Sequence, residues 1–219
     1  MAGVRRRAEP TRTPDTGVFM SQTEEKPRRL VIQEFVSLDG LAAGKGDSVD
    51  FIPASTQGDA TFGREQVALM DTVDTLVLGR RTYEMFAGFW PKVTSGPEKE
   101  FADKWNALRK IVFSSTLARA PWGSWPEANV VRGDVAEEIA KLRKEPGKDI
   151  LLAGSISLAQ ALIRKASIDE YRLVLCPTTL GKGRMLFPED ASTLLKLRSA
   201  AMLERGGMSL IYDRIDGTG

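Results

Sequence analysis

The sequence contains no histidine, and this absence removes several of the commonest catalytic arrangements. Acid–base chemistry by imidazole, the Ser-His-Asp triad and the usual zinc sites all depend on that side chain. The single cysteine, Cys176, excludes an intrachain disulfide, and its place at the end of an apolar run favours a buried small hydrophobe. Any chemistry must come from other polar side chains or from a cofactor, and we expect no metal site.

Long apolar runs and a charge excess are also missing. No run approaches the roughly 18 residues of a membrane span, and no apolar segment follows the N-terminal arginines as it does in a secretory signal. We therefore expect a cytoplasmic protein without a membrane partner. The net charge of +2 resides in residues 1–28, which hold six Lys/Arg and four Asp/Glu. The rest of the chain is neutral, which argues against nucleic-acid binding.

Residues 1–28 are polar, contain proline and show no hydrophobic period, a pattern typical of a disordered tail. Their three consecutive arginines, at 5–7, leave a targeting patch open as an alternative. Met20 is an alternative start, because the ordered pattern begins only at Leu30. We expect residues 29–216 to form one domain, because they show neither an internal repeat nor a linker.

Strand and helix patterns alternate from residue 29 onward. The predicted strands are 29–36, 74–79, 110–114, 128–133, 149–154 and 169–177. The predicted helices are 59–73, 82–89, 97–108, 135–144 and 157–166. Residues 194–203 and 209–215 flank a turn and predict a closing hairpin. This order predicts an α/β fold with a mainly parallel sheet, flanking helices and an antiparallel edge at the C-terminus.

The ends of the first two strands are chemically unusual, and ligands of open α/β sheets bind beyond the carboxyl ends of strands. SLDGLAAGKGD (37–47) is either a glycine-rich turn or a mobile loop over a ligand with Asp39 beneath it. GRRT (79–82) is either a capped helix start with solvated arginines or a phosphate site, because free N–H groups and two guanidinium groups bind anions.

Two further strand ends carry hydroxyl groups. FSSTL (113–117) is either an ordinary capped turn or an anion contact, and AGSISLAQAL (153–162) leads a glycine and two serines into a helix. The sequence has neither the GxGxxG fingerprint nor the GxxxxGK[ST] phosphate loop. Two helix starts suited to anions and one hydroxyl-rich turn favour a ligand with several phosphates, of which a dinucleotide is the simplest.

These segments, taken in order, resemble the dihydrofolate-reductase-like superfamily. The greatest similarity is to the C-terminal reductase domain of the riboflavin-biosynthesis deaminase-reductase and its stand-alone bacterial forms. The resemblance covers residues 29–215. It rests on FVSLDGLAAG, DTLVLGRRTYEMFAGFWP, IVFSSTL, DILLAGSISLAQALI, DEYRLVLCPTTLGKGRMLFP and the closing hairpin.

The resemblance implies NADPH binding and hydride transfer to a C=N or C=O bond of a pyrimidine or pterin-like heterocycle, as in 5-amino-6-(5-phosphoribosylamino)uracil reductase. Asp39 matches a substrate-facing acid of the riboflavin-pathway reductases. The residues implied to bind the cofactor are Ala43, Gly79, Arg80, Arg81, Thr82, Ser114, Ser115, Gly154, Ser155, Ile156, Ser157 and Leu158.

Asp39 is the candidate catalytic residue, because no histidine exists to act as an acid. Partial burial beside a nicotinamide is expected to raise its pKa and to suit it to proton transfer. The alternative is a structural aspartate that caps its own turn. Phe51, Trp90 and Phe187 are candidates to line a pocket for a planar substrate, or else belong to the core or to a dimer interface.

One departure from dihydrofolate reductases bears on activity. Those enzymes carry a carboxylate on the first helix, and the matching position here falls near Gly63 and Arg64. A nucleotide-binding or regulatory protein of the same fold, without turnover, is therefore the alternative function. The apolar segments YRLVLC (171–176) and SLIY (209–212) predict an edge that a monomer would expose, so we expect a homodimer.

Overall fold

The computed structural model describes residues 27–215, so the predicted disordered tail lies outside the described residues apart from Pro27 and Arg28. The strands are β1 (Leu30–Ser37), β2 (Leu41–Gly44), β3 (Val73–Gly79), β4 (Arg109–Phe113), β5 (Ala120–Trp122), β6 (Trp125–Val131), β7 (Asp149–Ala153), β8 (Glu170–Cys176), β9 (Gly183–Met185), β10 (Leu195–Met202) and β11 (Met208–Arg214). The α-helices are α1 (Phe51–Thr56), α2 (Ala60–Thr72), α3 (Arg80–Phe89), α4 (Lys99–Ala107), α5 (Val135–Leu142) and α6 (Ile156–Arg164). Short 3-10 turns occupy 45–47 and 90–92.

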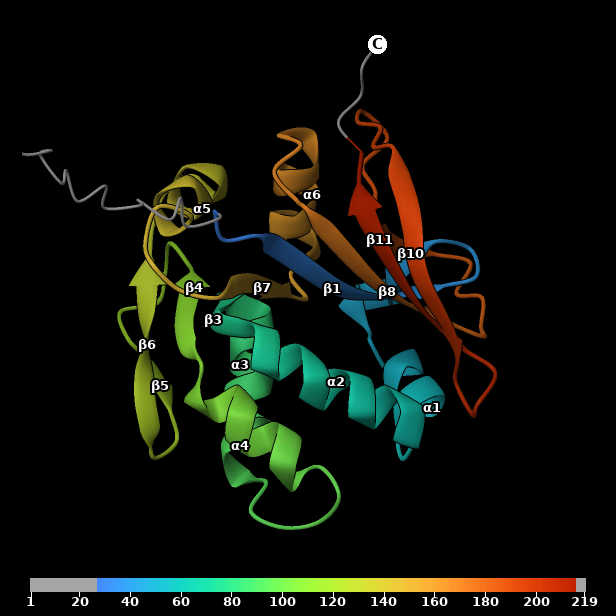
Figure 1. Ribbon diagram of the computed structural model, residues 1–219, viewed down its shortest axis with the longest axis horizontal. Helices are drawn as coiled ribbons and strands as arrows, with labels where there is room; N and C mark the ends of the chain where they lie inside the picture. Colours follow the sequence, from blue (N-terminus) through green and yellow to red (C-terminus); the bar gives the residue numbers. More distant parts are fainter. Residues whose placement is uncertain (1–26, 216–219) are drawn as a thin grey trace, which may run out of the picture.

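The main sheet has the strand order β10-β11-β8-β1-β7-β3-β4-β6-β5 (Figure 1). Its centre is parallel, and Ile32 of β1 lies opposite Leu152 of β7 on one side and Tyr171 of β8 on the other. Helices cover both faces of these strands, which is why their sequences are nearly continuous apolar runs. The predicted α/β fold with a mainly parallel sheet is confirmed.

The C-terminal hairpin is also confirmed, because β10 pairs antiparallel with β11 and β11 pairs antiparallel with β8. Four elements were missed: α1, the two-stranded ribbon of β2 and β9, and strand β5, which adds a second antiparallel edge. Each is six residues or shorter, and β2 and β9 are partners from distant parts of the chain. Local periodicity carries little information about such segments.

Two apolar layers enclose the sheet. Helices α5 and α6 cover one face, where Ile139 and Leu162 are fully buried, and α2, α3 and α4 cover the other, where Leu69 and Trp105 are buried (Figure 1). Cys176 is fully buried, as its sequence context predicted. These layers leave the two edges formed by the strand ends as the places for polar groups.

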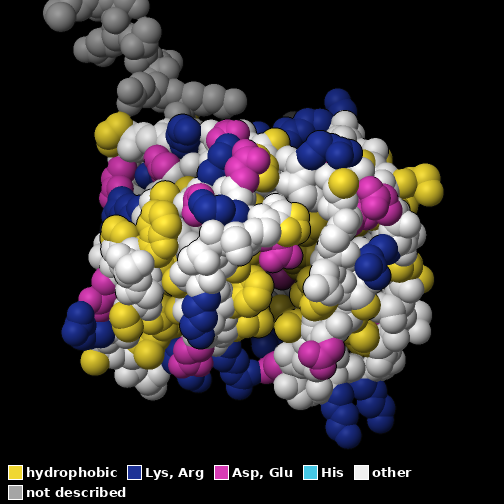
Figure 2. Space-filling model, turned by 90° about the horizontal axis from the view of Figure 1, so that it is seen from below, with side chains coloured by type: hydrophobic (Ala, Val, Ile, Leu, Met, Phe, Trp, Pro, Cys, Tyr) yellow, Lys and Arg dark blue, Asp and Glu magenta, His cyan; other side chains and the backbone are white. Residues whose placement is uncertain are grey.

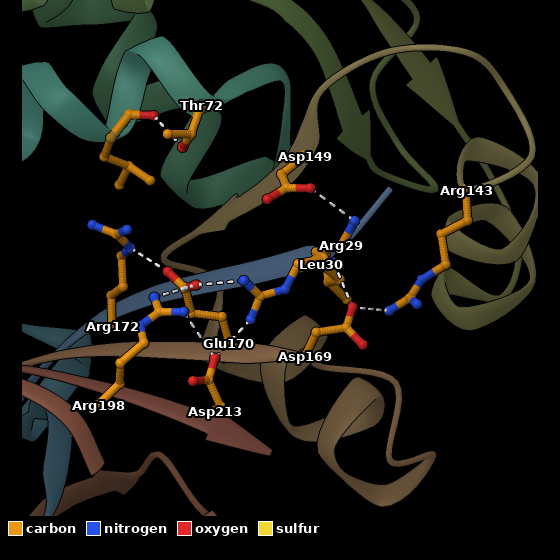
Figure 3. Close-up of polar contacts among 11 residues, drawn as sticks. Arg29, Leu30, Thr72, Arg143, Asp149, Asp169, Glu170, Arg172, Arg198 and Asp213 are labelled. Atoms are coloured by element: carbon orange, nitrogen blue, oxygen red, sulfur yellow. Dashed lines mark hydrogen bonds and ion pairs between the residues drawn. The ribbon is translucent and has the colours of Figure 1, made fainter. Parts of the chain in front are cut away.

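The amino edge, where the parallel strands begin, holds a dense ionic network (Figure 3). Glu170 is 3% exposed and pairs with Arg29 at 3.1 Å and with Arg172 and Arg198 at 2.6 Å each. Asp213 accepts hydrogen bonds from Arg29 and Arg198. The network ties the starts of β1 and β8 to the closing hairpin.

Arg28 belongs to this edge rather than to a tail. It is 4% exposed, donates to Thr75 Oγ1 at 2.7 Å and forms an ion pair with Asp74. Arg28 therefore belongs to the folded part of the chain, although the sequence pattern places it in the predicted tail. A buried arginine leaves no mark in such a pattern.

The predicted dimer edge needs a correction. Strands β8 and β11 are paired on both sides, so the segments 171–176 and 209–212 are interior to the sheet. The free C-terminal edge is β10, where Leu197 is 49% exposed and Met202 is 78% exposed.

Candidate nucleotide-binding site

The turns that follow β3 and β7 meet at Ser155. The N–H of Gly79 donates to Ser155 Oγ at 2.6 Å, and Thr82 Oγ1 shares a hydrogen bond of 3.0 Å with the same hydroxyl. The two segments that the sequence predicted as phosphate sites therefore form one continuous surface. Thr82 lies inside α3 and contacts the other turn instead of capping its own helix.

Glycine is required on both sides of this junction. A Cβ atom at Gly79 would lie 2.6 Å from Ser155 Oγ, and one at Gly154 would lie 2.9 Å from Thr82 Cγ2. Ser155 itself has left-handed backbone angles, with φ at 67°, which are uncommon for a residue with a side chain. Uncommon backbone of this kind concentrates at functional sites.

Two helix starts converge at this junction. Helix α3 begins directly after Gly79 and α6 directly after Ser155, and within residues 27–215 no side chain caps either start. The first N–H groups of a helix have no partner within the helix, and they carry partial positive charge. The geometry is thus suited to an anionic group shared by the two turns.

The two arginines of the predicted site lie at the surface beside this junction. Arg80 forms an ion pair with Glu84 at 2.9 Å, one helical turn along α3. Arg81 is 70% exposed and forms an ion pair with Asp47, which also lies 3.5 Å from Arg184. Through Asp47, the 37–47 loop reaches the start of α3.

Ser114 and Ser115 follow β4, on the side of β3 away from β7. Because Gly79 lies opposite Phe113 in the register, Ser114 comes next to the start of α3. Its Oγ accepts from the N–H groups of Thr116 at 3.2 Å and Leu117 at 3.0 Å, so it caps its own turn. Ser115 is exposed.

Asp39 ties one loop to another instead of facing a buried site. Ser37 Oγ donates to Asp39 Oδ1 at 2.6 Å, and the N–H groups of Gly181 and Leu180 donate at 2.8 Å and 3.1 Å. These bonds, that of Ser37 first, lower the pKa of Asp39 to about 2. The expectation of a raised pKa is wrong, because the carboxylate is exposed and accepts several hydrogen bonds. At neutral pH it has no proton to give.

Ala43 lies in the β2–β9 ribbon, so the alternative of a mobile loop does not describe residues 41–44, which form a paired strand. Ala43 is 2% exposed and lies opposite Arg184 of β9. A Cβ at Gly183 would lie 1.9 Å from Ala43 O, so the ribbon closes only with glycine there.

Phe51 and Trp90, the candidates for the substrate pocket, lie in separate apolar clusters. Phe51 is 9% exposed and packs with Val174, Cys176 and Leu203. Trp90 packs edge-on against Phe101, with ring centroids 4.9 Å apart. Phe187 stacks on Tyr171 at 6.1 Å. The alternative of core packing describes all three residues better.

Two polar groups in the middle of β1 belong to none of the sequence motifs described above. Gln33, 8% exposed, donates from Nε2 to Oε1 of Gln66 on α2 at 2.8 Å, on the side of the sheet that carries α2. Glu34, 4% exposed, lies on the opposite face, and burial raises its pKa to about 8. The signal was two adjacent polar residues inside an apolar strand, VIQEFV, which the strand prediction passed over.

One hollow and two pockets lie on the surface formed by residues 27–215. The side of the molecule that carries α1, α2 and α4 is hollowed near its centre, where hydrophobic side chains surround recessed acidic ones (Figure 2). The two pockets found elsewhere lie away from the paired turns, one beside Arg164 and Phe187 and the other beside Leu108 and Pro126.

In the described part of the chain, no cluster of acidic or sulfur ligands could hold a metal ion. No helix there is long and apolar enough to cross a membrane.

The strand order and the flanking helices give an α/β fold of the dihydrofolate-reductase-like type. The solved structure of dihydrofolate reductase from Enterococcus faecalis, complexed with NADP(H), superposes with a TM-score of 0.51 at 19% identity and covers 86% of this chain and 97% of that one. That likeness shows the shared fold.

Residues 28–208 match the RibD C-terminal domain family, and the chain belongs to that family. It is 30% identical over 190 residues to the uncharacterized protein YyaP of Bacillus subtilis (strain 168), with 85% of this chain and 95% of that protein covered. A solved protein from Shewanella sp. PV-4, described as a riboflavin biosynthesis protein, is 26% identical with a TM-score of 0.67 and coverage of 86% and 99%.

Proposed function

We propose that the protein is an NADPH-dependent reductase of a pyrimidine or pterin-like heterocycle, of the riboflavin-biosynthesis type. The observation that carries this proposal is the convergence of the α3 and α6 starts at Ser155, without side-chain caps. Two adjacent helix starts fit the two phosphates of a dinucleotide. In the Enterococcus faecalis dihydrofolate reductase the same fold is complexed with NADP(H), which supports the choice of cofactor.

We propose that the two arginines at the start of α3 give the site its preference for NADPH over NADH. Arg80 and Arg81 are now held by single carboxylates at the surface. Exposed ion pairs of this kind contribute little, about 0–1 kcal/mol. A phosphate bound by a guanidinium fork is stronger, so the 2′-phosphate of NADPH would replace Glu84 or Asp47. Ser114, next to this turn in the register, lies on the same side.

The substrate side is proposed to be the face of β1 that carries Gln33. When bound, NADPH supplies the hydride, and the chain positions the acceptor ring. The single hydrogen bond between Gln33 and Gln66 leaves the oxygen of one amide and the nitrogen of the other without a partner within residues 27–215, whichever way the two amides are turned. Phe35 and Phe62, next to this pair on the same two elements, meet edge-on at 5.8 Å and offer an apolar surface to a ring.

A nucleotide-binding protein without turnover is the second candidate. Gly63 is exposed and has nothing within 4 Å of an added Cβ, so α2 offers no carboxylate there. Asp39 is held by a neighbouring loop. Both observations remove an acid that a reductase would be expected to use.

One pair of measurements separates the two candidates. NADPH binding is titrated by fluorescence, and NADPH oxidation is followed against a panel of uracils, pterins and related heterocycles. Oxidation with at least one heterocycle supports the reductase. Binding without oxidation across the panel supports the second candidate, and no binding of NADPH contradicts both.

We also propose a homodimer formed along β10, in a cytoplasmic protein. Strand β10 is an unpaired edge, and Leu194, Leu197 and Met202 are exposed large hydrophobic residues on or beside it. Monomeric proteins usually protect such an edge. Light scattering is expected to give twice the chain mass of 24.0 kDa, and Leu197→Lys is expected to shift the mass toward the monomer. A wild-type mass near 24.0 kDa at micromolar concentration contradicts the dimer.

A further inference from the structure

Gln33 and Gln66 form an amide pair between β1 and α2. Gln33 Nε2 donates to Gln66 Oε1 at 2.8 Å, and each residue is 8% exposed. This bond uses one atom of each amide, so Gln33 Oε1 and Gln66 Nε2 have no partner within residues 27–215. Unlike Glu34 Oε1, neither of these two atoms is completely buried. Both are therefore open to contact with a ligand.

The amide pair lies next to the junction of the two turns. Gln33 is opposite Ala153 of β7 in the register, and its carbonyl oxygen accepts from the N–H of Gly154 at 3.3 Å. Gly154 is one of the two glycines that allow the turns to meet at Ser155. A ring bound at the amide pair is thus beside the proposed nucleotide site, on the face of β1 that carries α2.

Two aromatic rings flank the amide pair. Phe35 is two positions after Gln33 on the same face of β1, and Phe62 is one helical turn before Gln66 on α2. The two rings meet edge-on at 5.8 Å, and both are only partly buried. The side of the molecule that carries α2 is also the hollowed side (Figure 2). Apolar rings beside polar amide atoms suit a planar heterocycle, which has apolar faces and a polar edge.

The amide pair offers a fixed combination of hydrogen-bonding groups. Each amide has one carbonyl oxygen and one NH2 group, so the bond between them leaves one oxygen and one NH2 for a ligand. If both amides turn together, these two groups exchange places, but two oxygens are never presented. A lactam edge, with N–H beside C=O, matches this combination. A ring protonated as an amidinium turns two N–H donors to one side, and it needs the two acceptors of a carboxylate.

We propose that the pair of Gln33 and Gln66 determines the specificity of the substrate site. It accepts an uncharged heterocycle through a lactam edge and rejects a ring that is protonated as an amidinium. The proposal rests on the proposed function and narrows its substrate. The two glutamines position the ring, and they take no part in proton transfer.

Three small heterocycles and two variants test this specificity by binding. Uracil carries the lactam edge, 1,3-dimethyluracil lacks both N–H donors, and 2,4-diaminopyrimidine has the same ring but is protonated at about pH 6. Gln66→Glu supplies a carboxylate at unchanged side-chain length. The control is Gln57→Glu, which adds the same charge at an exposed glutamine at the end of α1. Dissociation constants are measured by ligand-observed NMR with saturating NADP+, and NADPH affinities and melting temperatures are recorded separately.

We expect the wild type to bind uracil at least about tenfold more tightly than either of the other heterocycles, the scale of one lost hydrogen bond. Gln66→Glu is expected to shift the ratio of uracil affinity to 2,4-diaminopyrimidine affinity about tenfold toward the cation. The control is expected to keep the wild-type ratio. NADPH affinity is expected to be equal in all three proteins, because the amide pair is on the substrate side.

Equal affinity of the wild type for uracil and 1,3-dimethyluracil would overturn the proposal, and this comparison does not depend on the folding of any variant. An unchanged ratio in a folded Gln66→Glu protein, or the same shift in Gln57→Glu, also rejects it. If the wild type binds NADPH but none of the heterocycles, the specificity role is rejected and the nucleotide site stands. Failure to bind NADPH contradicts the proposed function as well.

Discussion

The two edges of the central sheet treat polar groups in opposite ways. At the amino edge, Glu170 has three arginine partners and Arg28 is paired with Asp74 and Thr75. At the carboxyl edge, two helix starts have no side-chain cap in the described part of the chain, and Glu34, in the middle of β1, has an oxygen without a partner there. At the first edge these charged groups pair with one another, whereas the groups named at the second do not. We propose that the fold thus separates the edge that stabilises it from the edge that binds a ligand.

The largest expected effect is at the amino edge. Glu170→Ala leaves Arg29, Arg172 and Arg198 without their shared carboxylate. Removing one partner of a buried ionic network costs about 3–5 kcal/mol, and we expect the lower end, because the arginines are 19–41% exposed. Urea unfolding measures the loss. The control is Asp103→Ala, an exposed partner of Lys99, which is expected to cost less than about 1 kcal/mol. NADPH binding at the remaining folded fraction should not change.

The second effect tests the carboxyl edge by pH. The pKa of Glu34 is raised from 4.5 to about 8, so the folded state holds its proton longer than the unfolded state. The free energy of unfolding is therefore highest below pH 4.5, where Glu34 is protonated in both states, and it decreases as pH rises toward 8. Glu34→Gln cannot ionise. Its free energy of unfolding should exceed that of the wild type by on the order of 3 kcal/mol at pH 7. Near pH 4 the two proteins should be equally stable. A difference independent of pH contradicts the neutral carboxyl.

The third prediction tests the contact between the turns that follow β3 and β7. Gly79→Ala places a methyl group 2.6 Å from Ser155 Oγ, whereas Gly88→Ala, inside α3, meets nothing within 4 Å among residues 27–215. Overpacking costs about 1–3 kcal/mol, and we expect most of it to appear as weaker NADPH binding. Titration of both variants checks this. Equal affinity in the two would show that the junction is not the binding surface.

The arginines give a smaller and more selective effect. Arg80→Ala is expected to cost roughly 1–3 kcal/mol of NADPH affinity, the scale of a charged hydrogen bond. The loss for NADH should be smaller, because NADH lacks the 2′-phosphate. Arg64→Ala, a surface arginine on α2, serves as the control. The 2′-phosphate role is rejected by equal losses for the two cofactors.

The smallest effect concerns Asp39. Its pKa is lowered to about 2, so its contribution to stability is present above about pH 4 and is lost as pH falls through 2. Asp39→Asn is expected to lower the melting temperature at neutral pH, with little change between variant and wild type near pH 2. Turnover of any substrate found should stay close to the wild-type value. A hundredfold loss of turnover in a stable variant would restore the catalytic hypothesis.

The sequence predicted the parts of the fold that local patterns govern. The long strands and helices follow from apolar periodicity, and Asp134, an aspartate directly before a helical pattern, caps α5 through the N–H groups of Ala136 and Glu137. The segments around Gly79 and Gly154 could be proposed as phosphate sites, because strand ends, glycine and hydroxyl groups are visible in the sequence. That they share a single hydroxyl at Ser155 depends on strand order, which periodicity does not encode.

The contacts of the candidate substrate-side residues have a common physical cause. Asp39, Phe51 and Trp90 are candidates by residue type, but their contacts depend on partners distant in sequence, such as Gly181 for Asp39 and Val174 for Phe51. Glu34 was passed over because a strand prediction counts apolar residues and ignores an interruption. Its importance comes from burial without a partner, which only the tertiary structure reveals.

The central place of β1 also sets the order in which the chain can be completed. This strand precedes every other strand of the described chain, yet its partners are β7 and β8, which belong to the second half of the sequence. During synthesis an apolar strand must wait until most of the chain has emerged. Contacts of such long range slow folding. A chain truncated before β8 would leave Leu30, Ile32 and their neighbours exposed, and it should be recovered mainly as aggregate.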